Sequence, residues 1–91
     1  MLQLSRNPVI CAVELDGDMC LFHPDTAQYL TLNATGSAIW NLLEEPMNRE
    51  QLLSYLLQRY AIERADCHLD TEAFLAEAIE CNILLEQHAP Q

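Results

Sequence analysis

The feature that most constrains the fold is the stretch 28–40, which passes from strand-forming to helix-forming residues without a loop. Residues 29–32 read Tyr-Leu-Thr-Leu, types that suit a half-buried pleated surface. Asn33 follows as a helix N-cap, because its side-chain oxygen can accept a hydrogen bond from the free N–H groups of the first turn. Ala38, Ile39 and Leu42 then recur at helical spacing. The stretch predicts a strand fixed rigidly to a helix.

A β-hairpin is predicted ahead of this corner. The dipeptide Asp16-Gly17 is a strong two-residue turn signal, and it separates two runs of strand-forming residues, 9–15 and 18–23. After a turn at 24–27, the strand 28–32 closes a three-stranded antiparallel sheet and lies at its edge. That edge has no lysine, proline or bulge to block the addition of another strand. The turn also fixes the register of the hairpin, in which the facing pairs are Leu15–Asp18, Val13–Cys20 and Cys11–Phe22.

Helices are predicted for the rest of the chain. The first runs over 34–45 and ends before Pro46, and Gly36 in its first turn indicates close packing. The second is capped by Asn48 in a capping box with Gln51 and extends to Tyr60. A polar connection over 61–68 leads to a third helix, from about residue 70 to residue 81, which the left-handed conformation favoured by Asn82 would end. Residues 83–85 form a short apolar tail. The sequence therefore predicts one α+β domain over 1–91, with a core at about 9–85, frayed termini and three helices after the sheet.

The predicted third helix has a core-facing stripe and a second, distinct face beside it. Its predicted core stripe is Thr71, Leu75, Ala78, Ile79 and Asn82, with Phe74 on one shoulder. The opposite shoulder has small residues at its centre and acids at its margins: Leu69, Glu72, Ala73, Ala76 and Glu80. Alanine there is either helix-forming filler or the wall of a groove beside the edge strand.

Charge limits the partners of the chain. Fourteen acidic residues against four arginines, with no lysine, give a formal net charge of −10. Such a surface repels phosphate backbones and favours a basic or neutral partner, although excess acid can also serve solubility alone. No apolar run is long enough to span a bilayer, and the N-terminus lacks the zones of a signal peptide. We expect a cytoplasmic protein that binds neither nucleic acid nor membrane.

No constellation of catalytic or metal-ligating residues is apparent. The cysteines are too far apart in the sequence for a recognised metal motif, and we expect them to be small buried residues. There is no nucleophile motif, Gly-rich loop or phosphate cradle, and the histidines are dispersed. We expect a binding protein that is not an enzyme and needs no cofactor or metal. The cysteines in question are Cys11, Cys20, Cys67 and Cys81, and the histidines are His23, His68 and His88.

An ordered set of soft motifs resembles a known family. The residues Tyr29-x-x-Leu32-Asn33-x-x-Gly36-x-x-Ile39-Trp40 are similar to the strand-to-helix corner of PqqD-like domains, the recognition elements for ribosomally synthesised precursor peptides. The likeness continues through 48–60 and through 74–84, so that it covers about residues 9–85. Asn82 stands where the family commonly has glycine. The resemblance implies a winged helix-turn-helix-like domain that captures a leader peptide as an added β-strand.

The resemblance also implies partners and site residues. It is greatest to the standalone recognition proteins of lasso-peptide pathways, which work with a separate leader peptidase and a cyclase. The alternative within the family is the peptide chaperone for a radical SAM enzyme in pyrroloquinoline quinone biosynthesis. Two other classes are a winged-helix DNA-binding regulator, disfavoured because residues 70–81 contain no basic residue, and a protein that merely dimerises through its edge strand. The expected peptide-binding residues are Gln28, Tyr29, Leu30, Thr31 and Leu32 on the strand, and Leu69, Glu72, Ala73, Ala76, Glu77 and Glu80 on the helix, where Glu72, Glu77 and Glu80 would steer basic residues of the leader.

Overall fold

The computed structural model describes residues 2–59 and 64–88. An antiparallel sheet with the order β2-β3-β4 is followed by helices α1, α2 and α3, and a separate antiparallel pair, β1-β5, joins the two ends of the chain. The predicted α+β fold, a three-stranded sheet followed by helices, is confirmed in the described residues. The bounds are β1 (Leu2–Arg6), β2 (Cys11–Leu15), β3 (Asp18–Phe22), β4 (Tyr29–Leu32), α1 (Ala34–Leu42), α2 (Arg49–Arg59), α3 (Arg64–Glu80) and β5 (Leu84–His88).

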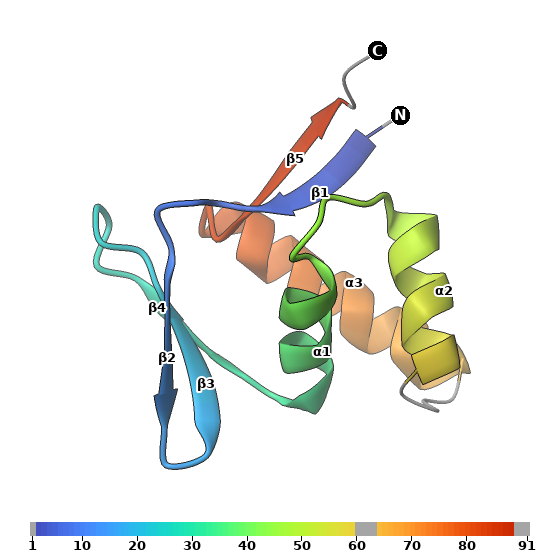
Figure 1. Cartoon of the computed structure of the whole chain (residues 1–91), viewed down its shortest axis with the longest axis horizontal. Helices are drawn as coiled ribbons and strands as arrows, with labels where there is room; N and C mark the ends of the chain where they lie inside the picture. The colour runs from blue at the N-terminus through green and yellow to red at the C-terminus, as the bar shows by residue number, and fades with distance from the viewer. Residues whose placement is uncertain (1, 60–63, 89–91) are drawn as a thin grey trace.

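The two sheets lie at different sides of the molecule. Figure 1 shows the β2-β3-β4 sheet at one side and the β1-β5 ribbon, with both termini, at another. In both views α1 lies between α2 and the three-stranded sheet, and α3 runs from the lower end of α2 toward the β1-β5 ribbon. Among the described residues, no helix combines the length and the apolar composition needed to cross a bilayer. The β2-β3-β4 sheet and α3 are the elements that border the candidate binding site.

The hairpin forms as its sequence predicts. Asp16 and Gly17 have φ angles of 52° and 86°, as a two-residue turn of this kind requires. All three predicted cross-strand pairs are present in the register of β2 with β3. The first strand of the hairpin, β2, begins at Cys11 rather than residue 9. Asn7 accepts hydrogen bonds from the backbone N–H groups of Val9 and Ile10 and holds the residues before β2 in a turn.

The strand-to-helix corner is also confirmed. The Asn33 side chain accepts a hydrogen bond from the N–H of Gly36 at 2.8 Å and caps α1 one residue after β4 ends. A Cβ atom on Gly36 would lie 3.2 Å from the Phe74 ring, so glycine is what lets α3 approach α1 this closely. The helix ends at Leu42 and not at residue 45, because the chain must turn to pair Met47 with Leu4.

The second and third helices differ in how well their limits were predicted. The capping box is confirmed, since Gln51 N–H donates to Asn48 Oδ1 at 2.8 Å and Asn48 N–H donates to Gln51 Oε1 at 3.1 Å. The predicted end at Tyr60 lies outside the described residues. The predicted start of the third helix near residue 70, after a polar connection, is wrong, because α3 already begins at Arg64. No glycine or proline interrupts 64–69, so nothing there prevents the helix from extending.

The β1-β5 ribbon was not predicted. Leu84 and Leu85 of the predicted apolar tail continue through residues 86–88 as β5, which pairs antiparallel with β1 from Leu2 opposite His88 to Arg6 opposite Leu84. Leu4 is 1% exposed although it lies outside the predicted core range. Arg6 is placed over the ring of buried Trp40, 4.5 Å from its centroid, and its Nε donates to the Trp40 carbonyl at 2.9 Å. The N-terminal residues thus close one side of the core.

The core joins all these elements. Asn82 has a φ of 59° and ends α3 in the left-handed conformation that its sequence predicts. Thr71, Leu75 and Ala78 of the predicted α3 stripe are buried, whereas Asn82 itself is exposed. The expectation of buried cysteines is wrong for Cys11, which is an exposed free thiol, and Cys20 and Cys81 are only partly buried. The fully buried aliphatic side chains come from both sheets and from each helix: Leu4, Leu21, Ile39, Leu43, Leu52, Leu56, Leu75, Ile83 and Leu84.

Candidate peptide-binding groove

The β4 strand is an open edge of the three-stranded sheet. It pairs with β3, and no described strand pairs with its other side. In an antiparallel ladder, successive residues alternate between bonding the partner strand and pointing their N–H and C=O groups away from it. The His23 N–H donates to the Gln28 carbonyl at 2.8 Å, which sets this alternation. It follows that Leu30 and Leu32 bond β3, whereas the N–H and C=O groups of Tyr29 and Thr31 point outward.

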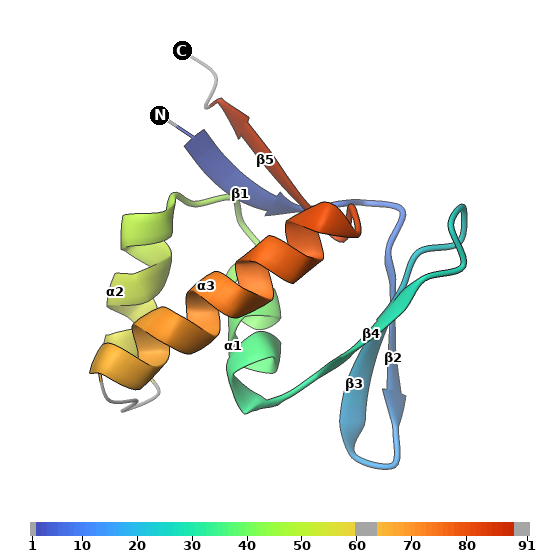
Figure 2. The ribbon, with the colours of Figure 1, turned by 180° about the vertical axis from the view of Figure 1, so that it is seen from behind.

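A groove lies between this edge and α3. Its volume is about 200 Å³, and β4 contributes Leu30 and Thr31 to its wall. Figure 2 shows α3 crossing in front of α1, with β4 running from the sheet into α1 beside it. The outward backbone groups of β4 therefore border a cavity that side chains of an added strand could enter. The complete lining is Leu30, Thr31, Asn33, Asp70, Ala73, Phe74 and Glu77.

The α3 wall of the groove follows one row of the helix. Asp70, Ala73, Phe74 and Glu77 are spaced i, i+3, i+4 and i+7, so that they share a face. Ala73 keeps this wall low, and the half-buried Phe74 supplies an apolar surface that is braced against Gly36. Two carboxylates, those of Asp70 and Glu77, flank the apolar centre, and the lining residues include no lysine or arginine. The groove therefore suits an apolar side chain with a basic neighbour.

The structure brings together part of the predicted set. Leu30, Thr31, Ala73 and Glu77 line the groove. Tyr29 does not line the groove, and its side chain is 73% exposed on the sheet, although its N–H and C=O groups lie on the open edge of β4. Three lining residues were not predicted; the helical row through Phe74 could have found the two on α3, and the third is the N-cap residue that directly follows β4. These residues are Asn33, Asp70 and Phe74.

Other predicted residues lie outside the groove. Leu32 is 4% exposed and belongs to the core, and Leu69 is 68% exposed on the surface. The Gln28 backbone is engaged in its own turn, where its carbonyl bonds His23 and its N–H donates to Thr26 Oγ1. The exposed residues that share α3 with the groove but do not line it are Ala76 and Glu80.

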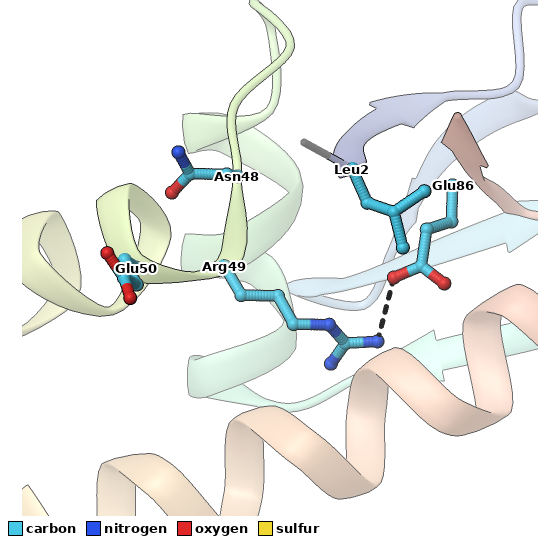
Figure 3. A pocket seen from close by; sticks show the side chains of 5 residues that line it. All are labelled: Leu2, Asn48, Arg49, Glu50 and Glu86. Carbon is cyan, nitrogen blue, oxygen red and sulfur yellow. Dashed lines mark hydrogen bonds and ion pairs between the residues drawn. The ribbon is translucent and has the colours of Figure 1, made fainter. Parts of the chain in front are cut away.

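Glu72 faces another part of the molecule. Its Oε2 accepts from Arg49 Nη1 at 3.0 Å, and the second nitrogen, Arg49 Nη2, donates to Glu86 Oε2 at 3.0 Å. Arg49, Glu86 and Leu2 line a cavity of about 210 Å³, and Figure 3 shows the Arg49 guanidinium paired with the Glu86 carboxylate. Because both carboxylates already engage this guanidinium, the cavity is a poor anion site, and Arg49 instead ties α2 to α3 and β5. Glu72 thus has a structural partner away from β4.

Metal binding finds no support in the described part of the chain. No group of His, Cys, Asp and Glu side chains there is arranged to hold an ion. His23 is 6% exposed, and its Nδ1 accepts a hydrogen bond from the Asp25 N–H at 3.2 Å. This histidine has a structural role in the turn between β3 and β4.

Comparisons with known proteins agree with this geometry. The family described as coenzyme PQQ synthesis protein D (PqqD) matches residues 18–84, so the chain belongs to the PqqD family, as its motifs predicted. One similar solved structure is TbiB1 in complex with the TbiA(beta) leader peptide, with 27% identity and a TM-score of 0.73 over 94% of this chain and 99% of that one. Another is a lasso peptide synthetase B1 complexed with the leader peptide, with 25% identity and a TM-score of 0.69 over 90% and 96% of the two chains. A comparison with curated protein sequences gives no significant match.

Proposed function

We propose that this protein binds the leader region of a ribosomally synthesised precursor peptide as an added β-strand on β4. The observation that carries the proposal is the open β4 edge, where Tyr29 and Thr31 direct their backbone groups outward and Thr31 lines the α3 groove. In this mode main-chain hydrogen bonds supply affinity, and a pocket for alternate side chains supplies specificity. Both parts are present at one place in the fold.

The groove constrains the peptide. A strand places every second side chain on the same side, so one apolar side chain of the leader would enter between Leu30 and Phe74. A basic side chain near it would meet Asp70 or Glu77. The excess of acid over the whole chain, at a net charge of −10, would attract such a segment from a distance. We therefore expect a leader that alternates apolar positions with lysine or arginine.

The pathway we favour is lasso-peptide biosynthesis. The similar structures of TbiB1 and of the lasso peptide synthetase B1 are both complexes with a leader peptide, and both match nearly the whole of this chain. In that setting the protein performs no catalysis and presents the precursor to a separate maturation enzyme, a leader peptidase or a cyclase. The family description supports a second candidate, a peptide chaperone for a radical SAM enzyme in pyrroloquinoline quinone biosynthesis.

Calorimetry distinguishes these candidates. The purified protein is titrated with the leader of the lasso precursor from the same pathway, with a scrambled peptide of identical composition, and with a pyrroloquinoline quinone precursor peptide. We expect saturable binding of the lasso leader alone, at about micromolar affinity or tighter. Preferential binding of the quinone precursor would favour the second candidate function, the peptide chaperone of pyrroloquinoline quinone biosynthesis. Equal binding of the scrambled peptide would contradict sequence-specific recognition altogether.

A further inference from the structure

The face of the three-stranded sheet that points away from the core is apolar. Side chains alternate between the two faces of a strand, and the buried Leu21 and Leu32 define the inner face. Contact between Cys20 Sγ and Thr31 Oγ1, at 3.7 Å, places both residues on the outer face. By the same alternation and the observed register, that outer face consists of Cys11, Val13, Leu15, Asp18, Cys20, Phe22, Tyr29 and Thr31.

This outer face is unusually exposed for its composition. Val13 is 44% exposed, Leu15 57%, Phe22 38% and Tyr29 73%. An antiparallel sheet with one buried face ordinarily carries polar side chains on the other. A contiguous group of large apolar side chains on such a surface marks an interaction site. None of these side chains belongs to the buried core, to which the inner face contributes Leu21 and Leu32, and β2 is exposed on both of its faces.

Charge indicates what kind of partner fits. Asp16 and Asp18 lie at the hairpin end of the outer face, and Asp25 lies in the turn at its other end. The sequence has no basic residue between Arg6 and Arg49, so the whole sheet region is free of positive charge. A second copy of this chain would bring its own acids against these and be repelled. The complementary surface is apolar at its centre and lined at its margin by lysine and arginine.

We infer that the outer face of the β2-β3-β4 sheet is the docking surface for a separate protein of that description, which in the proposed pathway is the enzyme that cleaves the leader. This inference rests on the proposed function. The face reaches β4 at Tyr29 and Thr31, and Thr31 also lines the peptide groove. An enzyme seated on it lies beside the bound leader strand and within reach of the peptide that continues from it. Docking and leader binding thereby use different parts of the same sheet.

The test removes apolar surface far from the peptide edge. The double variant Val13→Thr/Leu15→Thr places β-branched threonine at both positions of β2, which suits an exposed strand, and leaves β4 and α3 untouched. The matched control is Leu2→Thr, because Leu2 is also an exposed strand residue, 44% exposed, but lies on β1. Leader affinity is measured by calorimetry, and association with the purified leader peptidase by analytical ultracentrifugation.

The double variant should bind leader within about twofold of wild type while its association with the peptidase weakens at least about tenfold. The Leu2→Thr control should match wild type in both assays. Wild-type association of the double variant with the peptidase would overturn the inference. So would a wild-type homodimer that the double substitution dissociates, because the occupant would then be a second copy. If the unmodified protein bound no leader, the proposed function would be overturned instead. Ultracentrifugation of the protein with the peptidase in the absence of leader would then still test the docking surface.

Discussion

Proline at Thr31 is the substitution that separates the edge of β4 from its core pairing. The Thr31 N–H points away from β3, so proline there removes a donor to an added strand without breaking the β3-β4 ladder. Proline also favours an extended preceding residue, and Leu30 is already in the strand. We expect the Thr31→Pro variant to fold, with a far-ultraviolet circular dichroism spectrum and a thermal midpoint close to those of wild type.

The expected loss of affinity follows from one hydrogen bond. Removing the Thr31 N–H leaves the leader carbonyl unpaired in the interface, which costs about 1–3 kcal/mol. Since ~1.4 kcal/mol corresponds to a tenfold change, Thr31→Pro should weaken leader binding by roughly 5- to 150-fold in calorimetry.

Ala12→Pro is the matched control for this experiment. The N–H of Ala12 points outward from the opposite edge of the same sheet, because Ala12 alternates with Val13 in the β2-β3 register. The Ala12→Pro variant removes an equivalent outward donor at an edge where no leader is expected, so its affinity for the leader should equal that of wild type. Leader binding by Thr31→Pro within twofold of wild type, or an equal loss in Ala12→Pro, would refute the placement of the peptide on β4.

Further substitutions test the core, the groove and its charge. Leu4→Ala should lower the free energy of unfolding by about 2–5 kcal/mol in urea denaturation, since Leu4 is 1% exposed; an unchanged midpoint would mean that β1 contributes nothing to the core. Gly36→Ala should reduce leader affinity severalfold by displacing the Phe74 ring. Its stability should change little, because the helix-propensity gain of up to ~1 kcal/mol offsets the tight contact. An unchanged leader affinity in calorimetry would mean that the Phe74 ring is not part of the binding site. Glu77→Gln should weaken binding of a basic leader and reduce its salt dependence, whereas Glu72→Gln, which loses only the Arg49 pair, should not; equal effects would exclude a local charge contact.

Local chemistry explains what the sequence could predict. The Asp16-Gly17 turn, the Asn33 cap and the Asn48–Gln51 capping box each depend on residues within a few positions of one another. Their geometry follows from the residue types alone, and together they place most of the sheet and the starts of two helices. The open β4 edge follows from the same information, because it needs only the strand order and the absence of blocking residues.

Long-range contacts explain what it could not. Residues 84–88 become a strand only because β1, at the other end of the chain, pairs with them, and their own sequence, Leu-Leu-Glu-Gln-His, has no alternation. The α3 start was missed because helices end where something breaks them, and 64–69 contains no breaker. The groove wall was placed about one residue away from its actual face, since the rotation of α3 is set by Thr71, Leu75 and Ala78 packing into the core.

Amide hydrogen exchange of the leader complex tests most directly whether the leader adds to β4 as a strand. Leu30 and Leu32 already bond β3, so their N–H groups should be protected with and without peptide. The N–H groups of Tyr29 and Thr31 should exchange quickly in the free protein and become protected in the complex, while those of Ala12 and Glu14 on the opposite edge stay unchanged. Unaltered exchange at Tyr29 and Thr31 under saturating leader would contradict strand addition on β4.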